Sequence, residues 1–329
     1  MNVPSKLKVR KLSNITSKIN FGKEYKTPKP INDNLPCVYN IMLVAGSKGS
    51  GKGVIINHYL QLAEASGYIM PNGDKVEQRI IWCSGGTSKS KQNNILNELK
   101  YLDDDDRIDL DPESPNDKLK EIYETIKEER DLIVAYNVYR KVYNKYIKSK
   151  DLSDLNIDEL TLLNFKNFVD PSLDPDAPRT KDGKDLYHPR VVHFILDDLI
   201  GSETFSNNRK GNWANNISIK SRHDSPQLVP INLIYITQDF KKIPSVIRKQ
   251  VDYFILTKNS NRVAIVEAIS NEVGSIFSKE ELENVYDQIM HIPYGNLIIS
   301  IHKNEKSENR LRLGWENIII RDKKYVFDK

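Results

Sequence analysis

The chain has 329 residues, of which 39% are hydrophobic and 29% charged, and its 49 lysines and arginines exceed its 45 aspartates and glutamates to give a net charge of +4. This length suits one large α/β domain with insertions or two small domains, and the charge is too small to argue for a nucleic-acid partner. No apolar run approaches the roughly 18 residues of a membrane span and no signal-peptide pattern opens the chain, so we expect no membrane span.

The amino-terminal segment, residues 1–36, is basic. It is rich in lysine and contains only Glu24 and Asp33 as acidic residues. We predict a basic flexible arm, which is either a solvated tail or a docking or DNA-binding segment.

The chain has two cysteines, Cys37 and Cys83. Each falls at an end of a predicted core strand. We therefore expect buried thiols rather than a disulfide, as suits a reducing compartment.

A glycine-rich loop follows the first apolar run. Residues 38–45 predict a buried strand, and the next eight positions lead into a segment with helical spacing. This is the context in which G-x-x-x-x-G-K-[ST] denotes a phosphate-binding P-loop, with inward N–H groups, a helix N-terminus and a mobile lysine. We expect nucleoside triphosphate to bind at Gly46, Ser47, Lys48, Gly49, Ser50, Gly51, Lys52, Gly53 and Val54. An incidental glycine-rich turn is the alternative.

The middle of the chain alternates between a strand and long helices. Residues 79–84 predict a second core strand, and the aspartate-rich residues 103–117 predict an acidic surface loop. Helical periodicity runs through 117–149, and a shorter helix is expected from Ser153 or Asp154 to about Phe168. The stretch 170–190 is rich in Pro, Asp and Gly and predicts a loop. We interpret residues 100–190 as a helical insertion in the α/β domain.

A pair of carboxylates closes the next apolar run. Residues 191–196 predict a buried strand, followed directly by Asp197 and Asp198. Downstream of a P-loop, such a pair is typical of the second half of a nucleotide site, where one carboxylate orients Mg²⁺ and the other activates the attacking water. We assign the metal role to Asp197 and the base role to Asp198.

Gln238 ends a further predicted core strand, residues 231–237. Parallel sheets place functional groups at the carboxyl ends of their strands, so Gln238 should face the γ-phosphate beside Asp198 and orient water. An ordinary polar strand end is the alternative.

Arg222 and Arg248 flank this strand. Either arginine is a candidate to reach a neighbour's nucleotide and stabilise charge on the transferring phosphoryl group, although a surface arginine is the default.

The motifs occur in a set order: the P-loop, the strand closed by Asp197-Asp198, Arg222-His223, the strand ending in Gln238, Ile247-Arg248 and a strand at 253–256. This order and chemistry resemble the FtsK–HerA superfamily of DNA-pumping ATPases. They look closest to its viral branch, the genome-packaging ATPases of poxviruses, other large DNA viruses and virophages. Residues 293–299 are similar to the terminal strand of that family, and the resemblance covers about 37–302 without the insertion.

The resemblance implies an α/β fold, a P-loop NTPase with a central, mostly parallel sheet flanked by helices (RecA/FtsK–HerA-like), over residues 37–329. It implies ATP and Mg²⁺ as cofactors and a homo-oligomeric ring, a pentamer or hexamer, that threads double-stranded DNA into a capsid. A capsid or portal component would be a partner, and the location would be the virion or the infected host-cell cytoplasm.

The resemblance also implies roles for single residues: Lys52 on the phosphates, Asp197 with Mg²⁺, Asp198 on water, Gln238 as sensor, Arg222 as the first candidate for a trans-acting finger and Arg248 as the second. Gly53 departs from the pattern, because Ser or Thr normally ligates Mg²⁺ there. Either water fills that position, or Ser50 or another oxygen substitutes, or hydrolysis has been lost.

Two other functions are compatible with the motifs. A nucleotide-gated scaffold or assembly factor with weak or no hydrolysis is one, because of Gly53. A P-loop kinase is the other, although it needs a lid with several arginines, and the sequence shows no such cluster.

Overall fold

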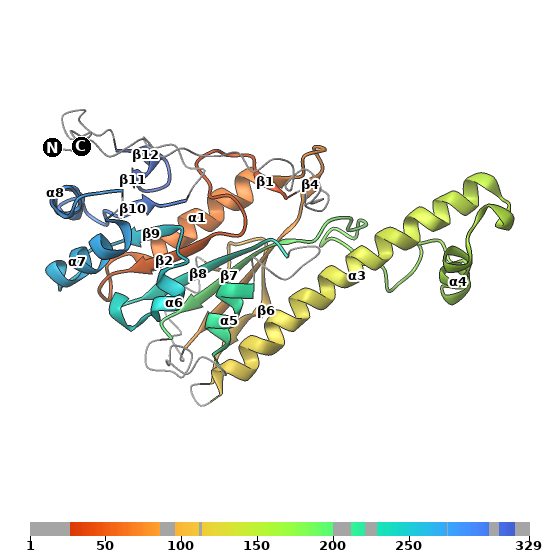
Figure 1. Ribbon diagram of the computed structural model, residues 1–329, viewed down its shortest axis with the longest axis horizontal. Coiled ribbons are helices and arrows are strands. Elements are labelled where there is room, and N and C mark those ends of the chain that lie inside the picture. Colours follow the sequence, from red (N-terminus) through yellow and green to blue (C-terminus); the bar gives the residue numbers. More distant parts are fainter. Residues whose placement is uncertain are drawn as a thin grey trace, which may run out of the picture.

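The computed structural model describes residues 27–85, 96–111, 114–199, 212–220, 229–274, 276–302 and 309–319. At its centre is a nine-stranded sheet of order β12-β11-β10-β9-β2-β8-β7-β5-β6 (Figure 1). Neighbouring strands from β9 to β6 all pair in parallel. These parallel strands are β2 (Ile41–Ala45), β5 (Gln78–Ser84), β6 (Leu102–Asp109), β7 (Val191–Asp197), β8 (Ile231–Thr237) and β9 (Tyr253–Leu256). The predicted mostly parallel α/β fold is therefore confirmed.

Apolar runs explain why these segments form central strands. Every residue of β2, β8 and β9 is buried, as expected for strands that are covered on both faces. Alternate residues of β2 belong to different layers of the core, with Leu43 on one face and Met42 and Val44 on the other. The strands predicted near 38–45, 79–84, 191–196, 231–237 and 253–256 are all present.

Helices cover both faces of the sheet. The helix α1 (Lys52–Ser66) packs in the layer that contains Met42 and Val44. The opposite layer is formed with the first half of α3 (Pro115–Ser149) and with α5 (Trp213–Lys220), α6 (Ser245–Arg248), α7 (Arg262–Val273) and α8 (Lys279–Met290). No helix in the described part of the chain combines the length and the apolar character that a membrane crossing requires.

An antiparallel edge closes the sheet beside β9. The strands β10 (Leu297–Ser300), β11 (Leu311–Leu313) and β12 (Asn317–Ile318) pair successively with one another, and β10 pairs with β9. Trp315, in the turn between β11 and β12, donates a hydrogen bond from Nε1 to the carbonyl oxygen of Ile55 at 3.1 Å. This edge therefore also holds α1 in place.

The acidic segment after residue 102 is a strand and not the surface loop that we predicted. It forms β6, which pairs in parallel with β5 at the edge of the sheet. Asp106 is only 4% exposed and accepts two hydrogen bonds from Arg79, at 2.8 and 2.9 Å. Paired burial of its charge explains why an aspartate-rich run can be part of the sheet. The helical part of the segment 100–190 therefore begins only at α3.

The outer half of α3 leaves the body of the domain and forms a projecting arm with α4 (Ile157–Phe165) (Figure 1). The arm has a small core of its own, which includes Tyr139 and Leu163. We expected α4 to begin at 153 or 154 and to reach 168, but residues Leu152–Asp154 form a separate 3-10 turn. A capping box between Asn156 and Glu159 instead sets the start of α4.

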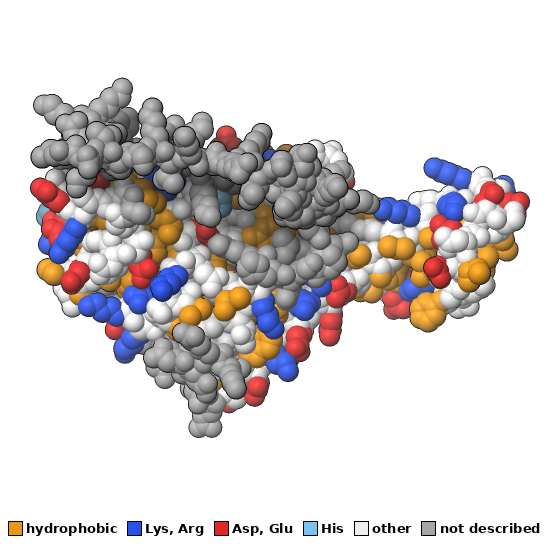
Figure 2. Space-filling view, in the orientation of Figure 1, with side chains coloured by type: hydrophobic (Ala, Val, Ile, Leu, Met, Phe, Trp, Pro, Cys, Tyr) orange, Lys and Arg blue, Asp and Glu red, His pale blue; other side chains and the backbone are white. Residues whose placement is uncertain are grey.

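The surface of the arm carries apolar side chains (Figure 2). Ile157, Phe165 and Leu173 are among the exposed large hydrophobic residues of the chain. At the base of the arm, Glu129 of α3 pairs with Arg79 of β5 and with Arg190, which precedes β7. This network connects the helix to the sheet strands.

Two further predictions concern the amino-terminal region and the thiols. Residues 1–26 of the predicted basic arm lie outside the described residues, whereas β1 (Lys29–Pro30) pairs with β3 (Tyr68–Ile69) in a small sheet completed by β4 (Lys75–Val76). Neither cysteine forms a disulfide, and Cys83 is buried as predicted. Cys37 is exposed, which corrects our expectation, because it lies in the turn before β2 rather than in the strand.

Candidate nucleotide-binding site

The glycine-rich loop connects β2 to α1 and has the backbone of an anion-binding turn. Gly49 and Gly51 have φ angles of 75° and 94°, in the left-handed region that glycine tolerates. The loop is anchored to neighbouring strand ends: the backbone N–H of Gly46 donates to the carbonyl of Thr237, and that of Ser47 to the carbonyl of Lys258. Its position at the N-terminus of α1 places unpaired helix N–H groups and a positive dipole end beside the loop.

Lys52, the first residue of α1, folds back over this loop. Its Nζ donates hydrogen bonds of 2.9 Å to the carbonyls of both Gly46 and Ser47. Burial lowers the pKa of Lys52, while the charges of Asp198 and Asp197 act in the opposite direction. The ammonium is therefore within the electrostatic reach of both carboxylates.

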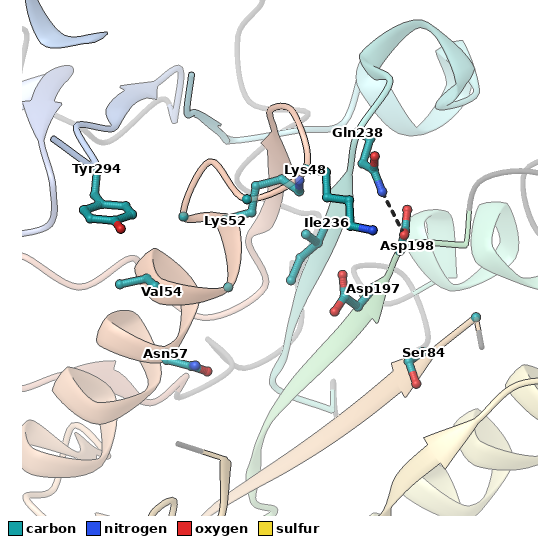
Figure 3. A pocket seen from close by; sticks show the side chains of 14 residues that line it. Lys48, Lys52, Val54, Asn57, Ser84, Asp197, Asp198, Ile236, Gln238 and Tyr294 are labelled. Atoms are coloured by element: carbon teal, nitrogen blue, oxygen red, sulfur yellow. Dashed lines mark hydrogen bonds between the residues drawn. The ribbon is translucent and has the colours of Figure 1, made fainter. Parts of the chain in front are cut away.

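The two carboxylates stand at the end of β7, as the sequence predicted, but their environments differ. Burial and the neighbouring charge of Asp198 raise the pKa of Asp197 to about 6, against the opposing effects of Lys52 and a hydrogen bond from Trp82. Asp198 is exposed and has a φ of 50°. It accepts a hydrogen bond of 2.9 Å from Nε2 of Gln238, the residue that directly follows the adjacent strand β8 (Figure 3).

One cavity of about 470 Å³ joins these groups. Its lining consists of Lys48, Gly49, Gly51, Lys52, Gly53, Val54, Asn57, Ser84, Gly85, Asp197, Asp198, Ile236, Gln238 and Tyr294. The structure thus brings together most of the predicted P-loop residues, the carboxylate pair and the strand-end glutamine, from segments up to about 190 positions apart in the chain. Gly46, Ser47 and Ser50 support the loop without lining the cavity.

The predicted arginines are not among the described lining residues. Arg248 Nη1 lies 3.5 Å from Glu272 Oε1, and its guanidinium lies over the ring of Phe240, 5.4 Å from the ring centroid. This pairing holds α6 against α7. Arg222 lies outside the described residues.

Five lining residues escaped the sequence analysis, namely Asn57, Ser84, Gly85, Ile236 and Tyr294. Ser84 ends a predicted strand, so its position carried a usable signal, and its hydroxyl donates to Asp109 at 2.6 Å. Asn57 follows Gly53 at a spacing of one helical turn, which is also readable from sequence. Tyr294 and Ile236 carry no such signal, because the loop before β10 and the interior of β8 reach the cavity only through the fold.

The donor set fits a magnesium ion. Mg²⁺ takes oxygen ligands and is commonly held by one or two carboxylates, substrate phosphates and several waters. Asp197 provides such a carboxylate beside the P-loop. Ser50, one substitute considered for the hydroxyl missing at residue 53, does not line this cavity; its Oγ lies 2.6 Å from Thr257 Oγ1 and donates to the carbonyl of Ser47.

The strand order and the site together define the class of fold. A P-loop follows β2, a carboxylate pair ends β7, and β8 with its terminal glutamine lies between these two strands. This arrangement is that of a P-loop nucleoside-triphosphate-binding domain with an additional strand between its two phosphate-site strands.

Comparisons with known proteins find similarity in structure only. No protein-family model and no curated protein matches the chain. Similar solved structures include B204, the DNA-packaging ATPase from Sulfolobus turreted icosahedral virus, with 15% identity, coverage of 84% of this chain and 97% of that one, and a TM-score of 0.40. ATPases 2 and 3 of EssC from Geobacillus thermodenitrificans share 13% identity, with coverage of 85% and 38% and a TM-score of 0.38. The pCW3 conjugation coupling protein TcpA shares 15%, with coverage of 85% and 64% and a TM-score of 0.37. Because the sequence identities and TM-scores are this low, these similarities transfer no activity or partner to this chain.

Proposed function

We propose that this chain is an ATP-driven DNA translocase that packages double-stranded viral DNA into a capsid. The observation that carries the enzymatic part is the convergence of Lys52, Asp197 and the hydrogen-bonded pair Asp198–Gln238 on one cavity at the P-loop. The order of the sequence motifs, which resembles that of the FtsK–HerA superfamily, supports DNA as the substrate of the motor.

Each group has a chemical task in ATP hydrolysis. The P-loop N–H groups and Lys52 bind the phosphates, and Asp197 holds Mg²⁺, which when bound neutralises charge on the β- and γ-phosphates. Asp198 accepts a proton from the attacking water. Gln238 orients that water and, through its hydrogen bond, fixes the carboxylate of Asp198.

The proposal includes a ring of identical subunits. Among the described residues, no arginine lines the cavity, although an arginine commonly stabilises the charge on the transferring phosphoryl group. We assign this role to Arg222 of a neighbouring subunit, with Arg248 as the second candidate. The open side of the cavity would then be completed by assembly.

The rate of ATP hydrolysis with and without double-stranded DNA tests the function. We expect DNA to stimulate hydrolysis by the wild-type chain, while Asp198→Asn, the matched control, stays inactive under both conditions. Tight nucleotide binding without turnover would favour the scaffold function that Gly53 suggests. Phosphorylation of a small acceptor molecule would favour a kinase.

A further inference from the structure

Asn57 is a buried polar residue without a partner inside the candidate site. Its side chain is only 3% exposed, and neither Oδ1 nor Nδ2 has a hydrogen-bond partner within the described structure. Asn57 also lines the cavity formed by the P-loop and the carboxylates. Figure 3 shows its amide directed from α1 toward the side of the cavity where Asp197 and Ser84 stand.

Such an amide is costly unless something binds it. A buried donor or acceptor without a hydrogen bond destabilises the fold, so most buried polar groups in proteins are paired. An unpaired amide directed into a cavity is therefore suited to form hydrogen bonds with a ligand bound there.

Its position relative to Gly53 indicates which ligand. Residues 53 and 57 are four positions apart on α1, so they lie one above the other on the same helical face, about 5–6 Å between their side-chain origins. Residue 53 is where a P-loop places the hydroxyl that ligates Mg²⁺, and Gly53 has no side chain. One turn is too far for the same direct contact, but a water molecule can span the difference.

We propose that the Asn57 side-chain oxygen takes over the task of the hydroxyl that residue 53 lacks, by accepting a hydrogen bond from a water in the hydration shell of nucleotide-bound Mg²⁺. Mg²⁺ usually keeps several of its waters in proteins, and residues that hold such outer groups tune metal affinity. This inference rests on the proposed function only in requiring that the cavity bind a nucleoside triphosphate with Mg²⁺.

The test measures binding and not turnover. A non-hydrolysable ATP analogue is titrated into the full-length protein at a series of Mg²⁺ concentrations and in EDTA. We expect Asn57→Ala to raise the Mg²⁺ concentration needed for half-maximal binding by roughly 10- to 100-fold, the range for outer-shell groups, and to leave affinity in EDTA unchanged. Adding Gly53→Ser to Asn57→Ala should lower the Mg²⁺ concentration for half-maximal binding back toward the wild-type value, because it returns a hydroxyl to the usual position.

Asn57→Asp tests whether the side-chain oxygen or the side-chain nitrogen of Asn57 makes the contact. A carboxylate oxygen accepts the same hydrogen bond, so this variant should keep binding in Mg²⁺. If the Asn57 amide instead donates directly to a phosphate, Asn57→Asp will weaken binding in EDTA as well, because two negative groups then face each other, and the proposal is overturned.

Thermal unfolding without nucleotide distinguishes a ligand-binding residue from a structural one. Asn57→Ala should melt at the same temperature as the wild type or higher, because it removes an unsatisfied buried amide. Asn215→Ala is the matched control, since Asn215 is a buried asparagine that does not line the cavity. The inference fails if Asn57→Ala leaves the Mg²⁺ dependence unchanged, or if Asn215→Ala shifts it equally. Failure of the wild type itself to bind the analogue in Mg²⁺ would overturn the proposed function instead.

Discussion

Gln238 donates a hydrogen bond of 2.9 Å from Nε2 to Asp198 Oδ2, and the two residues directly follow the paired parallel strands β8 and β7. The sheet therefore sets the separation of a neutral amide and a carboxylate at the mouth of the cavity. An amide in this position holds the carboxylate without adding charge, which leaves Asp198 able to accept a proton from water. In the proposed mechanism, Gln238 positions the carboxylate and Asp198 accepts the proton.

Asp198→Asn should stop hydrolysis while nucleotide still binds, because it removes the proton acceptor and preserves shape. Asp197→Ala should instead weaken Mg²⁺-dependent nucleotide binding. Single-turnover hydrolysis and equilibrium binding of ATP distinguish the two effects. Equal loss of affinity in both variants would show that the carboxylates do not divide the work as proposed.

Lys52→Ala should abolish steady-state turnover and weaken ATP binding, because we propose that Lys52 is the P-loop cation that binds the phosphates. Lys48→Ala is the matched control, since Lys48 also lines the cavity but is exposed and lies in the middle of the loop. The measurement is ATP affinity and turnover for both variants. Unchanged turnover in Lys52→Ala would place the phosphate site elsewhere.

Asp197 should make stability depend on pH in a defined direction. Its pKa is about 6 in the folded chain, above the ordinary value of about 3.9. Between these values the folded state binds a proton that the unfolded state has released, so the free energy of unfolding falls as pH rises through this window, and the loss is complete above about pH 6. Asp197→Asn should therefore be more stable than the wild type near neutral pH.

The measurement is denaturant unfolding of both proteins between about pH 4 and pH 7. The stability difference should shrink as pH falls toward the lower limit, and at most about 3 kcal/mol is expected from a two-unit shift. A difference that is constant across this range would mean that Asp197 does not titrate as described.

Tyr294→Ala should weaken ATP binding. The Tyr294 ring lies on the far side of the P-loop from the carboxylates in Figure 3, is 75% exposed and is held at a φ of 56°. This exposed ring at the cavity, on a residue whose backbone is in the left-handed region, is suited to stack on the base, and we expect its removal to cost roughly ten-fold or more in affinity. Tyr294→Phe should retain binding. Binding of inorganic tripolyphosphate, which has no base, should be the same in all three proteins, and an equal loss for tripolyphosphate would contradict stacking.

Arg222→Ala should reduce ATP turnover by about a thousand-fold or more, with nucleotide binding intact, if Arg222 acts as a finger across a subunit interface. Mixing this variant with excess Asp198→Asn should recover part of the activity, because mixed rings contain some intact composite sites. The recovery is measured over a series of mixing ratios, with ring formation checked by light scattering. Absence of recovery in mixed rings, or full activity of isolated monomers, would contradict the shared site.

Sequence patterns were sufficient where the relevant interactions are local or where burial is continuous. The P-loop, the strands β7 and β8 and the side chains that end them could be predicted, because a fully buried parallel strand must be apolar and its polar end marks the edge of the sheet. The order of these motifs then led to the prediction of a nucleotide-binding site. None of this required knowing which strands are neighbours.

The remaining features depend on contacts between distant segments. An aspartate-rich run became the strand β6 because Arg79 neutralises Asp106, and nothing near Asp106 in sequence indicates that partner. Ser50 turned toward Thr257, Arg248 paired with Glu272, and Tyr294 reached the P-loop from a loop more than 200 residues later in the chain. Hydrophobic periodicity indicates which side chains of a segment are exposed and which are buried, but it does not indicate which charge, hydroxyl or ring of a distant segment lies beside them.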